Sequence, residues 1–419
     1  MLGGSRLWRH ADFLKFWSGQ TISVVGGEVT TFALPTLAIL QFHASALVVG
    51  LLVAIQRLPF AFMTLFVGVL TDRVRRRPLM ILADSGRAIA LASIPVAFAL
   101  GVLGLGQLFV VGLCIGIGNV VFDIAYLAYL PTLVGQGDIV EANNKATTSF
   151  SVAVLVGPGM GGVLVQLIGA ARAIGVNALS YVVSVVTLLW IAQPEPPPHP
   201  RQEGSSFAGE LREGIRLVFH HPLLRSLVAM MTTDAFGQQL ALPIFLIFFY
   251  RSLHLTPAAA GLVFAGFGVG AIVGSLAAAR AVAVLGLGRA IALGIGGSAL
   301  AFVMMPLALV LPALPWLMLA AFIDGVFITT MDIQQVSLRQ EVTPPRLQGR
   351  MNATFRTFFW GVWPIANFLG GFLADRIGAT AVILIAGGVR IVPISIVLLS
   401  PIGRLRSHAE VQPQPADAG

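Results

Sequence analysis

The chain has 419 residues, of which 57% are hydrophobic and only 11% are charged. A soluble domain carries about 25% charged residues, so this composition excludes an ordinary soluble protein and indicates that lipid is the solvent. The formal net charge of +8 does not indicate a nucleic-acid partner here, because the basic residues gather at the ends of hydrophobic runs, as in membrane proteins. The single cysteine, Cys114, excludes an internal disulfide and a cysteine metal cluster.

Hydrophobic runs of about 20 residues, the length that a helix needs to cross a membrane, recur along the whole chain. We predict an all-α membrane protein with twelve transmembrane helices arranged as two six-helix bundles. The predicted spans are 14–40, 47–70, 79–101, 107–131, 147–169, 171–193, 223–250, 257–281, 289–311, 314–338, 351–373 and 377–401.

The stretch from Gly68 to Arg77 joins the second and third spans with four arginines and one aspartate within six residues. Charge this dense cannot lie in hydrocarbon, and clustered arginine beside a span marks the cytoplasmic side. With this stretch inside, twenty of the 26 Lys and Arg residues fall on the cytoplasmic side and three on the outer side. We therefore predict a multi-pass protein of the bacterial inner (plasma) membrane with both termini in the cytoplasm.

A polar break separates two halves of six spans. It begins with a proline-rich segment and continues into a helix whose residues Leu211, Ile215, Val218 and Phe219 share one face. This pattern predicts an amphipathic helix lying on the inner membrane surface. We assign 1–193 to an N-terminal bundle, 194–222 to a cytoplasmic linker, 223–401 to a C-terminal bundle and 402–419 to a disordered cytoplasmic tail.

The two halves repeat each other. Ala33-Leu34-Pro35 recurs as Ala241-Leu242-Pro243 and Asn144 recurs as Asn352, both at an offset of 208 residues. Asp123 recurs as Asp332 at an offset of 209. A duplicated six-helix unit predicts a substrate site between the halves, near the middle of the membrane.

Glu28 lies near the middle of the first span. A charge at this depth is costly in hydrocarbon, so it needs either a partner or a function. Thr21 and Thr31 lie on or close to the same helix face, and a carboxylate there can carry a proton. The alternative is a static ion pair with Arg57, which lies at a similar depth in the second span. Thr21, Thr31 and Arg57 are assigned to the substrate cavity.

Asp234 and Asp324 are further candidates for proton coupling, because they also lie inside predicted spans. Gln238 lies one turn after Asp234 and is assigned with it to the substrate cavity. Arg390, in the last span, has no evident partner in the sequence.

Two charge pairs are assigned a structural role. Asp84 and Arg87 are three residues apart on one predicted helix, a spacing that lets their side chains meet. Asp332 and Arg339 are seven residues apart near the inner surface and are expected to pair there. Asp123 is expected to be structural as well, because its repeat counterpart is Asp332.

Trp360 and Trp363 lie inside the eleventh span rather than at its ends. Together with the phenylalanines around them, they suit an apolar, drug-like substrate. Contact with lipid or packing against other helices is the alternative.

Several motifs resemble those of the major facilitator superfamily of transporters. Gly68-x-x-x-Asp72-Arg73-x-Arg75-Arg76-Arg77 is similar to its loop 2–3 signature, with Arg75 where many members have glycine. Gly157-Pro158-x-x-Gly161-Gly162 resembles the core of its fifth-span motif, which is associated with proton-driven exporters. Arg57-Leu58-Pro59, Ala83-Asp84-x-x-Arg87 and Gly349-Arg350-Met351-Asn352 resemble the bacterial exporter branch that includes the enterobactin exporter and macrolide efflux pumps.

This resemblance implies a secondary transporter, not an enzyme, that acts by alternating access and proton antiport. It would export a drug, siderophore or secondary metabolite and thereby contribute to multidrug resistance. Gly68, Asp72, Arg73, Arg76 and Arg77 would form its gating motif. We expect a monomer without cofactor or metal. The alternatives are an importer of a small solute and a non-transporting sensor or assembly partner.

Overall fold

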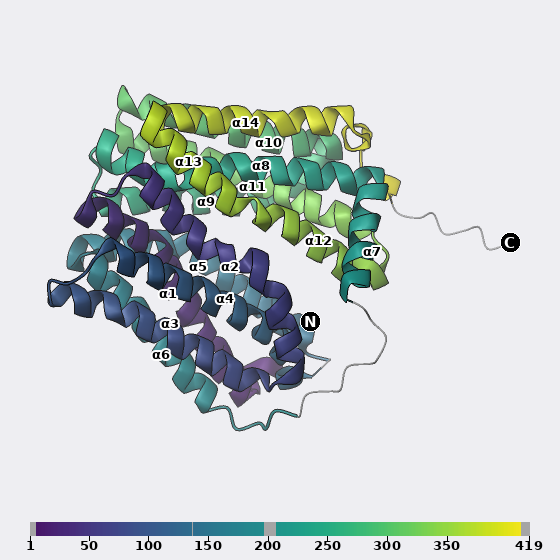
Figure 1. Ribbon diagram of the computed structural model, residues 1–419. Coiled ribbons are helices and arrows are strands. Elements are labelled where there is room, and N and C mark those ends of the chain that lie inside the picture. Colours follow the sequence, from purple (N-terminus) through teal and green to yellow (C-terminus); the bar gives the residue numbers. More distant parts are fainter. Residues whose placement is uncertain (1–5, 136, 197–206, 412–419) are drawn as a thin grey trace. The chain divides into compact units, whose positions relative to one another are not determined.

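The computed structural model describes residues 6–135, 137–196 and 207–411, and these residues are almost entirely helical (Figure 1). The chain divides into two compact units. Unit 1 comprises 1–202 and 255–262, and unit 2 comprises 203–254 and 263–419. The main boundary therefore falls within the linker between the two predicted bundles.

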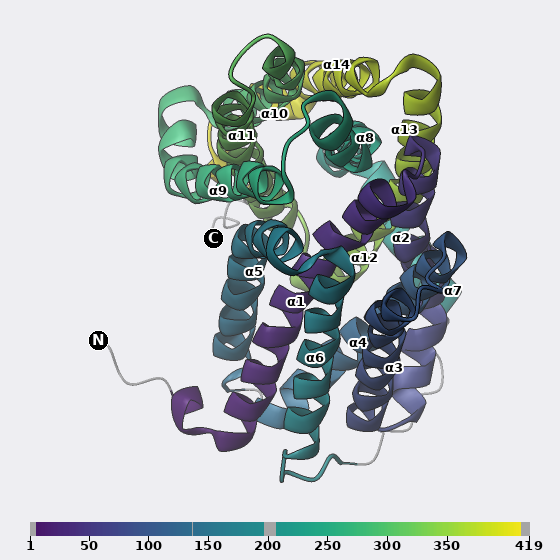
Figure 2. The same ribbon diagram turned by 90° about the vertical axis from the view of Figure 1, so that its left-hand side faces the viewer.

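Unit 1 is built from the first six long helices, coloured purple through blue to teal in Figure 1. They are α1 (Ala11–Phe42), α2 (Ala46–Arg73), α3 (Arg76–Ala99), α4 (Leu105–Val134), α5 (Ile139–Ile168) and α6 (Ala170–Leu189), preceded by the short 3-10 helix η1 (Arg6–Arg9). Figure 2 shows α1 beside α5 and α6, and these helices pack on one another.

Unit 2 begins with the linker helix α7 (Phe207–His220) and contains the second set of long helices. They are α8 (Pro222–Ile247), α9 (Pro257–Leu285), α10 (Leu287–Met304), α11 (Ala313–Glu341), α12 (Gln348–Gly361), α13 (Trp363–Ile377) and α14 (Ala379–Leu399). Short turns join or extend them: η2 (Phe248–Ser252), η3 (Met305–Leu309), η4 (Pro345–Leu347), η5 (Pro401–Arg404) and η6 (His408–Val411). The first six residues of α9, 257–262, belong to unit 1.

The fold class is confirmed as an all-α membrane protein of twelve transmembrane helices in two bundles. Within the described residues, 11 helical segments are long and apolar enough to span a membrane. The remaining span is α8, which has 26 residues but carries the polar Asp234, Gln238 and Gln239. The predicted eleventh span is broken at Val362 into α12 and α13, because Pro364 lacks the N–H that a continuous helix would use.

The four apolar residues of the linker helix are divided between two faces, and its position on the inner membrane surface stays a prediction. Val218 is buried in the core of unit 2, whereas Ile215 and Phe219 are exposed, so the four apolar residues do not form one buried face. The side chain of Leu211 lies outside the described residues. Gly214 explains the docking, because a Cβ at this position would lie only 2.8 Å from the carbonyl oxygen of Arg350. The helix thus places its smallest residue against the α12 backbone, and Phe219 contacts the α12 residue Phe358 at a centroid distance of 5.3 Å.

The prediction of a disordered tail is wrong for residues 402–411. The backbone N–H groups of Leu287 and Gly288 donate to the carbonyls of Arg406 and Leu405 at 3.1 and 3.0 Å. The first N–H groups of a helix have no partner within it, and the tail carbonyls satisfy those of α10. His408 adds ring contacts to Glu341 and Gln334. Residues 412–419 lie outside the described part of the chain.

Candidate functional site

Unit 1 contains a cavity of about 460 Å³ bordered by all six of its long helices. The predicted residues Thr21, Glu28, Thr31 and Arg57 all line it. Other polar residues in its wall are Gln20, Ser23, Thr30, Gln56, Arg87, Asn119, Asp123, Asn143, Thr147, Ser149 and Asn177. Its aromatic residues are Phe13, Phe16, Trp17, Phe60, Phe122, Tyr126, Phe150 and Tyr181. The cavity therefore offers both hydrogen-bonding groups and apolar ring surface within the depth of the membrane helices.

Three charged side chains from different helices line this cavity together, namely Glu28 from α1, Arg57 from α2 and Asp123 from α4. Arg57 interacts electrostatically with both carboxylates. Glu28 is half-buried, whereas Asp123 is exposed to the cavity. The expectation of a structural role for Asp123 thus overlooked its position in the wall. The polar spacing Asn119, Asp123, Tyr126 along one face of an apolar helix was the signal that could have found it.

The second arginine of the wall, Arg87, is buried and forms an ion pair with Asp84 on the same helix. Its guanidinium also donates to Asn119 Oδ1 at 2.7 Å and lies 4.3 Å from the ring centroid of Tyr181. Ser184 of α6 donates to the Asp84 carboxylate. The charges of Asp84 and Arg87 therefore compensate each other, and the network joins α3, α4 and α6.

The glycine motif of α5 packs against α1 at the depth of Glu28. A Cβ at position 157 would lie 2.3 Å from the Glu28 Cβ, so only glycine fits there without a shift of either helix. One turn on, a Cβ at position 161 would lie 3.2 Å from the Phe32 Cβ. Pro158 lies between them in α5, and Gly162 is buried. The antiport-type motif and the intramembrane carboxylate are thus neighbours in space.

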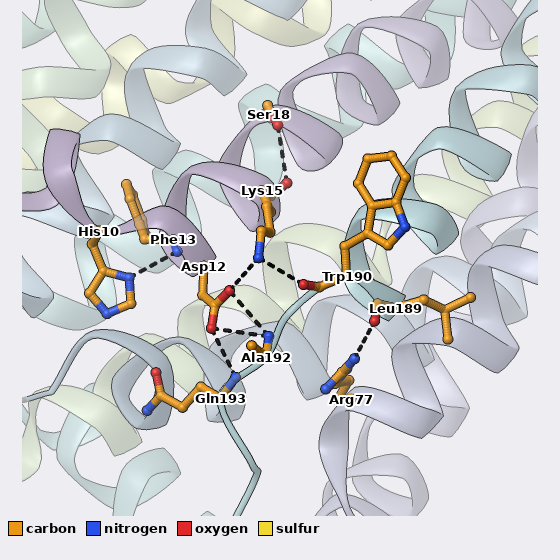
Figure 3. Close-up of polar contacts among 10 residues, drawn as sticks. All are labelled: His10, Asp12, Phe13, Lys15, Ser18, Arg77, Leu189, Trp190, Ala192 and Gln193. Carbon is orange, nitrogen blue, oxygen red and sulfur yellow. Dashed lines mark hydrogen bonds and ion pairs between the residues drawn. The ribbon is translucent and has the colours of Figure 1, made fainter.

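Two carboxylates hold the segment that follows α6 against the starts of α1 and α3. Asp12 accepts from the backbone N–H of Gln193 at 2.8 Å, and Lys15 bridges Asp12 and the Trp190 carbonyl at 2.8 Å each (Figure 3). Figure 3 also shows the Arg77 guanidinium donating to the Leu189 carbonyl.

The second carboxylate, Glu195, caps the N-terminus of α3. It accepts from the backbone N–H groups of Arg76 and Arg77 at 2.6 and 3.0 Å. Sequence reasoning missed Glu195, because it lies 119 residues from Arg76. Of the other predicted gating residues, Arg73 is exposed at the end of α2 and Gly68 has open space beside it. The side chain of Asp72 lies outside the described residues.

Unit 2 holds a buried charge cluster centred on Arg390. The fully buried guanidinium of Arg390 lies 2.9 Å from Asp234 Oδ1 and 3.3 Å from Asp324 Oδ1. Ser298 donates to Asp324, and the Phe302 ring centroid lies 4.3 Å from the Arg390 Cζ. The cluster joins α8, α10, α11 and α14, and it gives Arg390 the partners that the sequence did not reveal.

The remaining predicted cavity residues lie in unit 2 and are not in the wall of the unit 1 cavity. Gln238 is half-buried in α8. The rings of Trp360 and Trp363 flank the break between α12 and α13, with centroids 6.4 Å apart. Arg356 lies over the Trp360 ring at 4.2 Å, so this aromatic group already binds a cation of its own chain.

The predicted ion pair between Asp332 and Arg339 is not found among the described residues, where no nitrogen–oxygen distance of 4 Å or less joins them. Seven residues correspond to about 10.5 Å along a helix, too far for an ordinary side-chain pair. The guanidinium of Arg339 instead lies 5.2 Å from the ring centroid of Phe355. Asp332 is exposed, and its interaction with Arg339 is electrostatic only.

Two six-helix units with a charged cavity at the depth of their membrane helices define a multi-pass membrane transport protein. Residues 6–416 match the family described as transmembrane secretion effector, and the chain belongs to this family of major facilitator transporters. The members of this family are membrane transporters, not enzymes. Membership is consistent with a multi-pass protein of the bacterial inner membrane.

Named relatives are similar over almost their whole length. The chain is 25% identical to the multidrug efflux pump Tap of Mycolicibacterium fortuitum, covering 86% of this chain and 88% of that one. It is 26% identical to the enterobactin exporter EntS of Citrobacter koseri, covering 100% of this chain and 98% of that one.

Solved structures show the same fold at lower identity. A bacterial homologue of the lysosomal transporter Spinster, in an inward-facing and occupied conformation, matches with a TM-score of 0.73 at 14% identity, over 99% of this chain and 100% of the other. A bacterial homologue of the iron transporter ferroportin matches with a TM-score of 0.71 at 16% identity, over 92% and 98%. At these identities the likeness concerns the fold alone.

Proposed function

We propose that the chain exports a small hydrophobic or amphipathic compound across the bacterial inner membrane by alternating access, in exchange for protons. The family and two relatives named as an efflux pump and a siderophore exporter support export. The cavity supports the substrate class, because a site with aromatic rings and a few polar groups suits a compound with both kinds of surface. A drug, siderophore or secondary metabolite falls in this class.

The observation that carries the proton exchange is the charge balance of the cavity. Three carboxylates, Glu28, Asp84 and Asp123, lie with two guanidiniums, Arg57 and Arg87, in and behind its wall. The fully ionised group has a formal charge of −1, and an uncompensated charge at membrane depth is costly. Binding of one proton removes this charge.

Glu28 is our choice for the proton carrier. Asp84 is engaged by Arg87 and Ser184, and Asp123 is already exposed to the cavity, where water can solvate it. Glu28 is only half-exposed and is pressed against Gly157, so its ionised form gains the least from solvent.

Asp234 and Asp324 are second choices, because both bind the same buried arginine, Arg390. A static cluster of this kind supports a structural role rather than proton exchange. The loop 2–3 residues Gly68, Asp72 and Arg73, with Arg76 and Arg77, are proposed to control the change between inward- and outward-open states. We further propose that the protein acts as a monomer with both termini in the cytoplasm.

The test begins with export screening of antibiotics and siderophores in a pump-deficient host, followed by reconstitution with the compound found. In proteoliposomes with an imposed pH difference, Glu28→Gln should bind the compound but not concentrate it. Exchange of labelled for unlabelled compound without a pH difference should survive, because that cycle moves no net proton. Glu141→Gln is the matched control, since Glu141 lies on α5 outside the cavity wall.

Uphill transport by Glu28→Gln at the wild-type rate would remove Glu28 as the carrier and direct the same experiment to Asp234 and Asp324. Loss of folding would instead favour a static pair, and Arg57→Leu combined with Glu28→Gln should then restore the fold. Accumulation of the compound in the direction opposite to export would support an importer.

A further inference from the structure

The helix α7 has one buried face and one largely exposed face. Gly214 and Val218 are buried, and Leu217 packs against the core of unit 2. Figure 1 shows α7 beside the end of α12, against which this face docks. At 3.6 residues per turn, the residues Arg212, Ile215, Arg216 and Phe219 fall on the opposite side of the helix, and all four are exposed.

The outer face combines basic and apolar side chains. Ile215 is 38% exposed and Phe219 is 42% exposed, and the two arginines flank them at helical spacing. One side of the Phe219 ring contacts the ring of Phe358 in α12, at a centroid distance of 5.3 Å, and its other side is exposed. Arg346, whose side chain is 77% exposed, lies 3.9 Å from Glu213 and extends the basic surface beside α7. Glu213 is itself engaged by Arg346 and Arg350, so it does not neutralise Arg212 or Arg216.

The position of α7 in the sequence, next to a membrane-spanning helix, indicates where its outer face lies relative to the membrane. His220 ends α7, and α8 begins at Pro222, so a single residue separates the linker helix from a membrane-spanning helix. One residue spans at most about 3.6 Å, so the end of α7 lies close to the start of α8, where we expect the lipid headgroups. An exposed stripe of arginine and large apolar residues at that level complements a surface with anionic headgroups above acyl chains.

We propose that the outer face of α7, formed by Arg212, Ile215, Arg216 and Phe219 with Arg346, binds anionic phospholipid. The arginines contact the headgroups, and Ile215 and Phe219 enter the acyl boundary. Gly214 and Val218, together with the Glu213–Arg350 ion pair, hold the helix to unit 2. The bound lipid therefore anchors this end of unit 2 in its leaflet, independently of the transported compound.

The first experiment titrates the purified full-length protein with phosphatidylglycerol or phosphatidylcholine and follows the melting temperature, because a ligand that binds only the folded state raises it. Phosphatidylglycerol should stabilise the wild type, and phosphatidylcholine should not. Arg212→Gln with Arg216→Gln should need about thirtyfold more phosphatidylglycerol for the same shift. Arg404→Gln with Arg406→Gln removes the same charge from two other exposed arginines and should titrate like the wild type.

Equal stabilisation by the two lipids, or a wild-type titration of the α7 double variant, would overturn the proposal. A second measurement does not depend on charge-altered variants. In a Cys114→Ala background, a spin label at Ile215→Cys in phosphatidylglycerol nanodiscs should relax with oxygen and be shielded from a water-soluble nickel chelate. A label at Arg404→Cys should show the reverse. Equal nickel accessibility at both positions would also reject the lipid contact.

Discussion

Replacement of Arg390 by methionine tests whether the charge cluster of unit 2 is structural. The guanidinium of Arg390 is fully buried between Asp234 and Asp324, at 2.9 and 3.3 Å. Methionine fills a similar volume but leaves two carboxylates facing each other without a cation. The expected result is a large loss of stability, with helices α8, α11 and α14 no longer held by one group.

The size of the expected loss of stability follows from the burial of the charged groups. Removal of one partner of a buried ion pair destabilises by about 3–5 kcal/mol, because the other charge stays buried. The contact with Phe302 at 4.3 Å adds to this, since a desolvated cation–π pair is worth about 2 kcal/mol. We therefore expect a loss of about 3–5 kcal/mol or more in the free energy of unfolding. Arg390→Met with Asp234→Asn and Asp324→Asn leaves no buried charge and should recover at least half of it.

Equilibrium unfolding in mixed micelles of sodium dodecyl sulfate and a non-ionic detergent measures these changes. Arg376→Met is the control, because Arg376 is exposed and lies 4.9 Å from the Phe372 ring, where a cation–π contact is worth only about 0.5–1 kcal/mol. If Arg390→Met loses no more than the control, the cluster does not hold unit 2 together. If the triple variant is less stable than the single one, the explanation by uncompensated charge is wrong.

Three further predictions concern gating, helix packing and pH. Asp72→Asn should insert normally but slow the exchange between inward- and outward-open states, which the labelling ratio of cysteines engineered on each side measures; an unchanged ratio with unchanged transport would count against a gating role. Gly157→Val should destabilise by about 1–3 kcal/mol, because its side chain overlaps Glu28, whereas Gly86→Ala, with open space around it, should not. Burial lowers the pKa of His221, so the unfolded state binds its proton more readily and stability should fall as the pH drops below about 6.5; thermal unfolding of His221→Phe should lack this component.

Much of the site was visible in the sequence, because a charge inside a hydrophobic run can be recognised locally. Glu28 was predicted to carry a proton and Thr21, Thr31 and Arg57 to line the substrate cavity, and these four residues do share one cavity. The position of Asp123 in the wall was not predicted, because its repeat partner does not show which way its own side of the helix faces. The cavity wall depends on the rotation of α4 about its axis, and packing against neighbouring helices sets that rotation.

The sequence by itself determined the fold class, the duplicated six-helix plan and the family. Hydrophobic length and repeated motifs are local properties, and the membrane restricts what they can form. Only the tertiary structure decided which charges meet. Arg390 finds Asp234 across 156 residues, and Glu195 caps a helix that begins 119 residues before it. Such partners depend on which helices are neighbours and on which of their faces meet. Residue spacing along the chain gives no information on either.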